Sequence, residues 1–531
     1  MKREDGIAQL SDGSIEWDIL VIGGGATGLG CAVDAASRGY RVALVEQSDF
    51  AKGTSSRSTK LVHGGVRYLQ QGNVSLVLEA LKERGLLCEN AVHLVSHQAF
   101  IVPAYKWWEG PFYGIGMKVY DALAGKLGLE RSKHLSKKAT LEKIPTLEED
   151  GLDGGVIYYD GQFDDARLAA NLAETVWDQG GVAVNYAGVT RLLQENGVTT
   201  GAVVVDHESG EEMEIKAKCV INATGVFSDG VRRMDEPDGK DIIAASRGVH
   251  LVLPPEFVPR DSAIMVPHTT DGRVLFAVPW HGFVVVGTTD EGTEDISLEP
   301  RATEEEIDFI LENAASYLHR DPTRDDVLSV FAGLRPLVKQ GDDENTAALS
   351  RDHTIIVSTS GLLTIAGGKW TTYRRMAEDA IDHAETVAGF DKRPCVTHDL
   401  RVHGSVSVEE KARLEAEGGS PLLYLYGSDA AGIEALVEGD AGLGELLDER
   451  LPYTKAEAVW AVREEMARSV EDVLARRTRS LLLGAQASMD VAEEVGGIVA
   501  KELGKDAAFG EESARRFRAV AEGYRVAGAA N

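Results

Sequence analysis

Cysteine is scarce in this chain, and long apolar runs are absent. The four cysteines are scattered without a C-x-x-C pair, which favours buried reduced thiols over a disulfide framework or a metal site: Cys31, Cys88, Cys219 and Cys395. A chain of 531 residues can bury a large core without such cross-links, and this length predicts two or more domains. We therefore expect no metal site, and reduced thiols suit a cytoplasmic protein.

Positive charge is also in short supply, since 55 Lys and Arg stand against 85 Asp and Glu. The resulting net charge of -30 argues against nucleic acid as a partner. No segment approaches the ~20 apolar residues that a spanning helix needs. The charged beginning, M-K-R-E-D, predicts no signal peptide. These absences favour a large enzyme that is soluble or bound peripherally to a membrane.

The most informative segment that is present lies near the N-terminus. Residues 18–22 form a short apolar run that predicts a buried parallel strand, and three glycines with G-x-G-x-x-G spacing follow where a helix should begin. Gly23 permits a tight turn, Gly25 lets backbone N–H groups approach a pyrophosphate, and Gly28 lets the helix pack on the strand. This unit predicts dinucleotide binding but does not by itself separate NAD from FAD.

The next segments extend this prediction. Residues 41–45 are expected to form the second strand, and Glu46 at its end is placed to accept hydrogen bonds from a ribose without a 2′-phosphate. A run of small hydroxylated residues that ends in a cation follows, with Thr54, Ser55 and Lys60 as its candidate contacts. Its composition is typical of a loop that wraps phosphates and a flavin edge.

Later apolar runs predict how the rest of the chain is organised. Strands at 219–221, 355–357 and 362–368 should return to the first sheet, and four small residues there would let the chain pass close to the cofactor: Ala223, Gly225, Gly367 and Gly368. Runs rich in β-branched residues at 249–253, 274–278 and 283–287 predict a separate antiparallel sheet.

From about Thr397 the pattern becomes helical. We expect Thr454 to cap a helix that contains Trp460 and Met466, and Asp490 to cap a helix over residues 491–503.

Several motifs, in family order along nearly the whole chain, resemble those of the FAD-dependent glycerol-3-phosphate dehydrogenases. They are K-L-V-H-G-G-V-R-Y-L at 60–69, F-D-D-A-R-L at 163–168, N-A-T-G at 222–225, V-G-T-T-D at 286–290, G-L-R-P-L at 333–337 and G-G-K-W-T-T-Y-R at 367–374. Residues 464–479 resemble part of the helical C-terminal domain of that family.

The resemblance implies an α/β fold with three parts. An FAD-binding Rossmann-like domain of the glutathione-reductase type would use segments near 15–70, 152–230 and 352–395. An interleaved substrate domain with an antiparallel sheet would use segments near 71–151 and 231–351, which completes an oxidoreductase region over 1–395. Residues 396–531 would form the C-terminal helical domain.

The resemblance also implies an activity. It is the oxidation of sn-glycerol 3-phosphate to dihydroxyacetone phosphate, with FAD as cofactor and a quinone or another molecule as electron acceptor. Three alternatives remain: an oxidase of the same fold that uses dioxygen, an amino-acid or amine oxidase, and a flavin-binding scaffold without turnover. The acceptor and any homo-oligomeric state stay open.

Candidate catalytic residues follow from residue type and from the resemblance. His250 is the best candidate base by residue type, because an unperturbed imidazole has a pKa near 6.5, and the resemblance places a substrate-facing histidine there. The family also offers Arg335 as the base, so this choice stays open. Lys369 follows two glycines and could reach both the substrate and the flavin ring.

A substrate phosphate calls for guanidinium groups, whose planar donors match an oxyanion. The resemblance implies this role for Arg67, Arg335 and Arg351, with Lys369 nearby. His63 and Tyr68 are expected to shape the flavin pocket and the adjoining substrate site, and covalent attachment of FAD at His63 stays open.

One segment runs against the acidic background. Residues 106–143 carry eight Lys and Arg against four Asp and Glu, together with five aromatic residues that include Trp107 and Trp108. Apolar residues at helical spacing with flanking cations are typical of an interfacial membrane helix, and a core helix with one solvated face is the alternative. Contact with lipid on the inner face of the cell membrane would suit an enzyme that reduces quinone.

Overall fold

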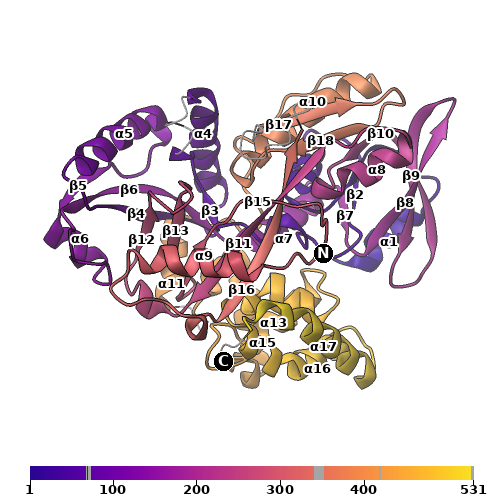
Figure 1. The fold of residues 1–531 in the computed structure, drawn as a ribbon. Coiled ribbons are helices and arrows are strands. Elements are labelled where there is room, and N and C mark those ends of the chain that lie inside the picture. The colour runs from indigo at the N-terminus through magenta and orange to yellow at the C-terminus, as the bar shows by residue number, and fades with distance from the viewer. Residues whose placement is uncertain (67–68, 70–72, 340–351, 418–419, 528–531) are drawn as a thin grey trace.

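The computed structural model describes residues 1–66, 69, 73–339, 352–417 and 420–527. Figure 1 shows two sheets side by side, with the C-terminal helices packed below both. None of the helices in these ranges is long and apolar enough to cross a membrane.

The first sheet contains the predicted dinucleotide-binding unit. Its central strands run in the order β18-β10-β1-β2-β7 and pair in parallel, while β17 adds an antiparallel edge and the β8–β9 hairpin extends β10. The strands predicted at the beginning and end of this region are therefore confirmed. The bounds are β1 Trp17–Ile22, β2 Val42–Val45, β7 Val182–Val184, β8 Ala187–Glu195, β9 Val198–Asp206, β10 Glu212–Asn222, β17 His353–Val357 and β18 Leu363–Gly367.

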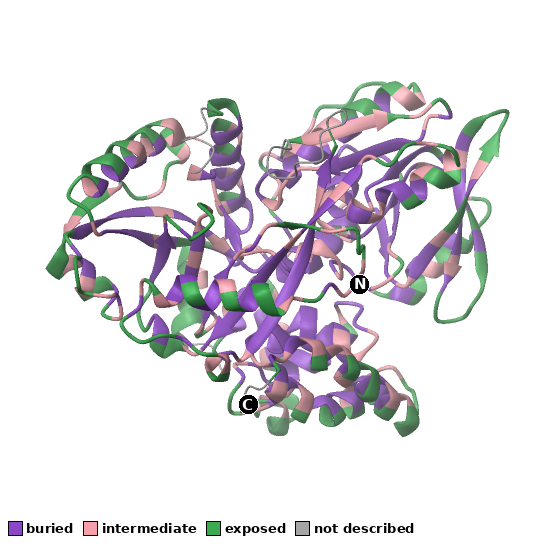
Figure 2. Cartoon of the chain, viewed as in Figure 1, coloured by how far each residue is buried: buried purple, intermediate pink, exposed green. Residues whose placement is uncertain are grey.

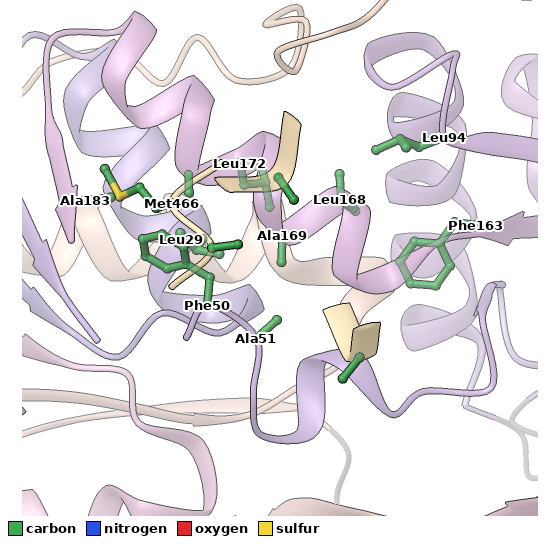
Figure 3. Close-up of a cluster of buried hydrophobic side chains, with 14 of the residues drawn as sticks. Leu29, Phe50, Ala51, Leu94, Phe163, Leu168, Ala169, Leu172, Ala183 and Met466 are labelled. Atoms are coloured by element: carbon green, nitrogen blue, oxygen red, sulfur yellow. The ribbon is translucent and has the colours of Figure 1, made fainter. Parts of the chain in front are cut away.

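Helices cover this sheet and build its largest core cluster. The helices α2 (Ala26–Ser37), α7 (Asp165–Asp178) and α10 (Tyr373–Ala388) pack on the sheet, and α1 (Arg3–Ser11) and α8 (Ser228–Asp235) lie near it. Figure 3 shows Leu29 and Leu172 from two of these helices in one buried cluster with Phe50 and Met466. Because Met466 belongs to the C-terminal region, that region shares the core of the first sheet.

The second sheet has ten strands and is mostly antiparallel. Its order is β15-β11-β14-β13-β12-β4-β6-β3, with β16 paired to β11 and β5 to β6. The predicted antiparallel neighbours β11, β14 and β13 are confirmed, while β4 and β12 pair in parallel. The bounds are β3 Leu61–Val62, β4 Val95–Ala104, β5 Lys133–Ser136, β6 Gly154–Phe163, β11 Ile243–Leu253, β12 Ser262–Val266, β13 Leu275–Trp280, β14 Phe283–Gly287, β15 Glu291–Gly292 and β16 Ser329–Val338.

Four helices surround the second sheet: α4 (Val74–Asn90), α5 (Glu109–Ala124), α6 (Lys137–Lys143) and α9 (Glu304–Ala315). Of these, α9 buries Ile307 and Ile310 against the sheet, where they join one core cluster. Figure 2 shows both sheets largely buried, whereas α5 and α6 at the far edge have exposed outer faces.

The C-terminal region is helical, as predicted. Thr454 caps α13, where its hydroxyl and the Glu457 carboxylate form a capping box. Two details were wrong: α13 ends at Arg463, before Met466, and Asp490 does not cap a helix. The elements are α11 Val408–Glu417, α12 Ala430–Gly439, α13 Lys455–Arg463, α14 Ser480–Leu483, α15 Ala485–Asp490, α16 Ala492–Glu502 and α17 Ala507–Ala521, with a π-helical turn over Asp472–Arg477.

The structure explains both differences. Met466 has a φ of 55°, so the chain has already left the helix there. Asp490 is the last residue of α15, and its carboxylate accepts hydrogen bonds from Gln486 and Arg450. The N-cap position of α16 is Val491, so Asp490 lies one residue too early to cap this helix.

Candidate active site and cofactor cavity

A cavity of 590 Å³ is lined by residues from both sheets. On the side of the first sheet it is bounded by the β1–α2 turn, by residues 45–59 and by the end of β10. On the other side it is bounded by residues of β11 and β16. It therefore lies at the carboxyl ends of the parallel strands, where doubly wound sheets bind nucleotides.

The three motif glycines fit a close approach of backbone to a ligand. Gly23 has a φ of 112°, and a Cβ on it would lie 2.7 Å from the carbonyl oxygen of Ala223. A Cβ on Gly28 would lie only 1.9 Å from the Gly23 oxygen, so any side chain there would push α2 away from the turn. Gly25 precedes α2 and lines the cavity, and the amide of Ala26 donates to Ser55 Oγ at 2.9 Å. The positive end of α2 thus faces the cavity.

Glu46 lies where the sequence predicts a ribose contact. It follows β2, lines the cavity and accepts hydrogen bonds from the amides of Gly24 at 2.7 Å and Ser48 at 2.8 Å. Burial raises the pKa of its carboxyl, and the two amides oppose this effect. These bonds fix the carboxylate at the cavity wall.

Lys60 differs from the prediction. Its ammonium donates to Asp165 Oδ2 at 2.7 Å and to the Ser56 carbonyl at 2.9 Å, and it does not line the cavity. Burial lowers its pKa to about 8, although Asp165 opposes the shift. The structure gives no support to a direct contact between this side chain and the cofactor, because a buried cation needs its own partner.

His250 lies on β11 and lines the cavity. Its Nε2 is 2.9 Å from Thr59 Oγ1, and its ring stacks on Phe331 with centroids 4.8 Å apart. Burial lowers its pKa well below the ordinary value, and the charges of Lys60 and Arg335 add to the effect. The imidazole is therefore neutral at ordinary pH and can accept a proton.

Arg335 comes from β16, the strand that pairs with β11. Its guanidinium donates to Asp290 Oδ1, Thr288 Oγ1 and the Thr289 carbonyl, each at 3.1 Å. A Cβ on Gly248 would lie 2.4 Å from one of its nitrogens, so this glycine makes room for the side chain. These contacts hold the planar group at the cavity, near His250.

The remaining predicted residues divide into two groups. Those that line the cavity are Thr54, Ser55, His63, Ala223, Gly225, Gly367, Gly368 and Lys369. Arg67, Tyr68 and Arg351 lie outside the described residues. Gly367 and Gly368, directly before Lys369, have φ values of 80° and 76°. Other residues rarely adopt this backbone conformation.

Four supporting residues were not predicted from the sequence. Asp290 and Thr288 belong to the V-G-T-T-D motif, which marked the segment without indicating that it would hold Arg335. Thr59 lies in the hydroxylated run, where composition alone could not single out the partner of His250. Phe331 carries no sequence signal beyond an apolar strand.

The cavity fits an adenine dinucleotide. The glycine turn and the α2 terminus suit a pyrophosphate, Glu46 suits a ribose, and the group of His250, Arg335 and Lys369 lines the same cavity. Residues 18–374 match the family model described as FAD dependent oxidoreductase. Residues 395–509 match the one described as C-terminal domain of alpha-glycerophosphate oxidase.

Individual proteins agree with these family matches. The human mitochondrial glycerol-3-phosphate dehydrogenase is 42% identical over 540 residues, which cover 96% of this chain and 74% of the human one. The Arabidopsis thaliana mitochondrial glycerol-3-phosphate dehydrogenase is 40% identical over 523 residues, covering 91% and 82%.

The structural match is equally broad. The Bacillus halodurans glycerol-3-phosphate dehydrogenase complexed with FAD superposes with a TM-score of 0.79 at 31% identity, covering 99% of this chain and 98% of that one. The L-alpha-glycerophosphate oxidase of Mycoplasma pneumoniae, at 18% identity and a TM-score of 0.56, shares the fold. The cofactor is FAD, and the chain belongs to the family of FAD-dependent glycerol-3-phosphate dehydrogenases.

Proposed function

We propose that this protein oxidises sn-glycerol 3-phosphate to dihydroxyacetone phosphate and passes the electrons to a quinone or another acceptor. The observation that carries this proposal is that a neutral histidine and an anchored arginine line the same cavity as the glycine cradle. The test is to add glycerol 3-phosphate anaerobically to the purified yellow protein. Bleaching of the flavin absorbance supports the proposal, and an unchanged spectrum contradicts it.

FAD held at the glycine turn and Glu46 would supply the oxidising chemistry, as the acceptor of a hydride equivalent from the carbon that bears the secondary hydroxyl. The protein has to remove the hydroxyl proton, and we assign this step to His250. Its Nδ1 is buried with no hydrogen-bond partner among the described residues, so proton exchange falls to Nε2. Nε2 shares a hydrogen bond with Thr59, which also lines the cavity. A substrate bound beside Thr59 can therefore pass its hydroxyl proton to Nε2.

Arg335 and Lys369 are the proposed cationic contacts of the substrate. A guanidinium held at three points by Asp290 and its neighbours presents a fixed group to an oxyanion. Arg335 remains the alternative base. Arg67, Tyr68 and Arg351 stay proposed substrate contacts on the strength of their motifs.

The cavity predicts which flavin is extracted from the protein. If Glu46 contacts the adenosine ribose and the α2 terminus contacts the pyrophosphate, denatured protein should release FAD, because FMN lacks the adenosine half. Chromatography of the released flavin checks this. Recovery of FMN, or a folded protein that retains no flavin, would contradict the assignment of this cavity.

The outer face of α5 supports contact with a membrane. Trp107, in the turn before α5, is 81% exposed, and Phe112 and Ile115 on the outer face of the helix are 54% and 68% exposed. The opposite face of α5 packs in the core through Tyr113, Met117 and Tyr120. The eight cations of residues 106–143 are all exposed. Apolar residues flanked by cations suit the headgroup region of an anionic bilayer.

The same helix leads back to the active site. Tyr120 accepts a hydrogen bond from the amide of Gly64 at 2.8 Å, and the neighbouring His63 lines the cavity. The exposed face of α5 is therefore connected through its buried face to the segment that borders the cavity. We propose peripheral association with the inner face of the cell membrane on this basis, with the rest of the protein in the cytoplasm.

Reversing three charges should release the protein from lipid. Each cation near an anionic surface contributes on the order of 1 kcal/mol, so changing Lys133, Lys137 and Lys138 together to Glu should abolish sedimentation with anionic vesicles at low salt. Turnover with a soluble dye should stay unchanged, because these side chains are exposed and do not line the cavity. Undiminished binding of the variant, or no binding by the wild type, would reject this face as the membrane contact.

The main rival is a glycerol-3-phosphate oxidase that reduces dioxygen. Steady-state turnover with a quinone analogue, compared with oxygen consumption and peroxide production, separates the two. A dehydrogenase should reduce the quinone analogue much faster than it consumes oxygen.

A further inference from the structure

One wall of the cavity has the C-terminal region on its other side. Residues 45–47, 51–55 and 57–59 line the cavity, whereas Asp49 and Ser56 within the same stretch do not. These two residues contact arginines of the segment 476–479 instead. Lys52 adds an ion pair with Glu471 at 2.9 Å. The side of the wall that faces away from the cavity is thus bonded to residues more than 400 positions later in the sequence.

Asp49 is the first point of contact. It lies three residues after Glu46, is fully buried, and receives Arg476 Nε at 2.5 Å and both terminal nitrogens of Arg477 at 2.7 Å. Burial alone would raise the pKa of Asp49, but the two guanidinium groups outweigh it and hold the pKa below its usual range. This carboxylate is therefore a charged anchor behind the ribose end of the wall.

Arg479 is the second point of contact. It donates to the Ser56 carbonyl at 2.6 Å and to Asp165 Oδ1 at 3.1 Å. The other oxygen of Asp165 accepts from the amide and hydroxyl of Ser58, at 3.0 and 2.7 Å, and from Lys60 at 2.7 Å. Arg479 thereby reaches Ser56 directly and Ser58 through Asp165, behind the hydroxylated loop.

The local backbone explains how consecutive arginines reach one carboxylate. Residues 472–477 form a π-helical turn, and the amide of Thr478 bonds to the Val473 carbonyl at 2.7 Å. Turns of this kind are rare and recur at functional sites. The wider turn directs Arg476 and Arg477 to the same side, toward Asp49.

We propose that the C-terminal domain is part of the cofactor site: Arg477 and Arg479 are positioning residues that hold the wall 45–59 in the form that binds FAD. Neither arginine lines the cavity, so both act through the residues they contact. Binding of FAD and docking of the segment 471–479 are then coupled, and each strengthens the other.

The first test measures FAD affinity by fluorescence titration of apoprotein. Arg477→Gln and Arg479→Gln should each raise the Kd for FAD by about tenfold or more, which corresponds to ~1.4 kcal/mol. The matched control is Arg84→Gln. Arg84 is equally buried and pairs with Asp160 at 3.0 Å, but neither residue lines the cavity. This control should lose thermal stability and keep its Kd.

Two further measurements separate positioning from general stability. Arg479→Lys keeps the charge and should recover part of the lost affinity. In the wild-type protein, binding of FAD should slow amide hydrogen exchange across residues 471–479. This measurement does not depend on the folding of any variant. Three results would each overturn the proposal: unchanged Kd values in both glutamine variants, an equal rise of the Kd in the Arg84 control, or hydrogen exchange in this segment that does not change when FAD binds.

Discussion

Replacing His250 by Asn is expected to lower kcat/KM for glycerol 3-phosphate by about 10²- to 10⁴-fold, the usual contribution of a general base. Asparagine retains a polar side chain near Thr59 but cannot accept the substrate proton. FAD content should stay normal, since His250 lies apart from the glycine cradle along the sequence and on the second sheet. Anaerobic stopped-flow measurement of flavin reduction would report the step directly.

The control for this variant is His93→Asn. His93 is also fully buried and neutral, with burial lowering its pKa to about 3, but it bonds to Asn171 and does not line the cavity. Its substitution should leave flavin reduction near the wild-type rate. A His250→Asn variant that loses less than about tenfold, far below the range for a base, would transfer the role to Arg335.

The lowered pKa of His250 also predicts the pH profile. Its proton acceptor form persists as the pH falls through 6.5, because protonation is shifted to more acidic values. The wild type should therefore show no loss of flavin reduction from this group between pH 8 and about 6.5, the ordinary histidine pKa. A fall in the rate of flavin reduction centred near pH 6.5 would instead indicate that the base is a histidine with an ordinary pKa.

Replacing Arg335 by Ala is expected to lower kcat/KM by about tenfold or more. The variant loses charge-assisted contacts to the substrate oxyanion worth roughly 1.5–3 kcal/mol, and FAD content should remain normal. Steady-state kinetics over a range of glycerol 3-phosphate concentrations would show the loss. A rise in KM would indicate that the guanidinium binds the phosphate, and a fall in kcat that it acts at the reacting carbon.

Arg247→Ala is the corresponding control. Arg247 lies on β11 close to the site but pairs with Glu306 at 2.8 Å and does not line the cavity. Wild-type kinetics for both variants would show that the substrate phosphate is bound elsewhere.

Much of the cofactor site was predictable because its determinants are local. Gly28 has to be glycine because a side chain there would clash with the turn at Gly23. Such local requirements produce the G-x-G-x-x-G spacing, which is visible in the sequence. Apolar strands such as β1 and β18 are equally clear, because a strand buried on both faces is a continuous apolar run. The family resemblance then supported His250, which residue type had already suggested, and singled out Arg335, which residue type alone would not have done.

The errors arose where distant partners decide the outcome. Lys60 ends a loop that faces the cavity, yet Asp165, more than 100 residues later, draws its ammonium into the interior. Asp490 is of a residue type that often caps helices, but it ends α15, where its carboxylate pairs with Arg450, 40 residues earlier. The ion pairs of Arg477 and Arg479 are of the same kind. A single sequence shows that these residues are charged and does not show which charges they meet.

The strand order of the first sheet bears on how the protein is made. The glycine turn is synthesised first, but its sheet is completed only when β18 pairs with β10, after residue 363 has left the ribosome. Until then β10 has an unpaired edge, which is prone to pair with other chains. The wall beside the turn gains its arginine contacts later still, with residues 476–479. A nascent chain therefore carries its first cofactor motif long before it has a site that can hold the cofactor, and truncated chains that end before β18 should aggregate and not accumulate as flavin-binding fragments.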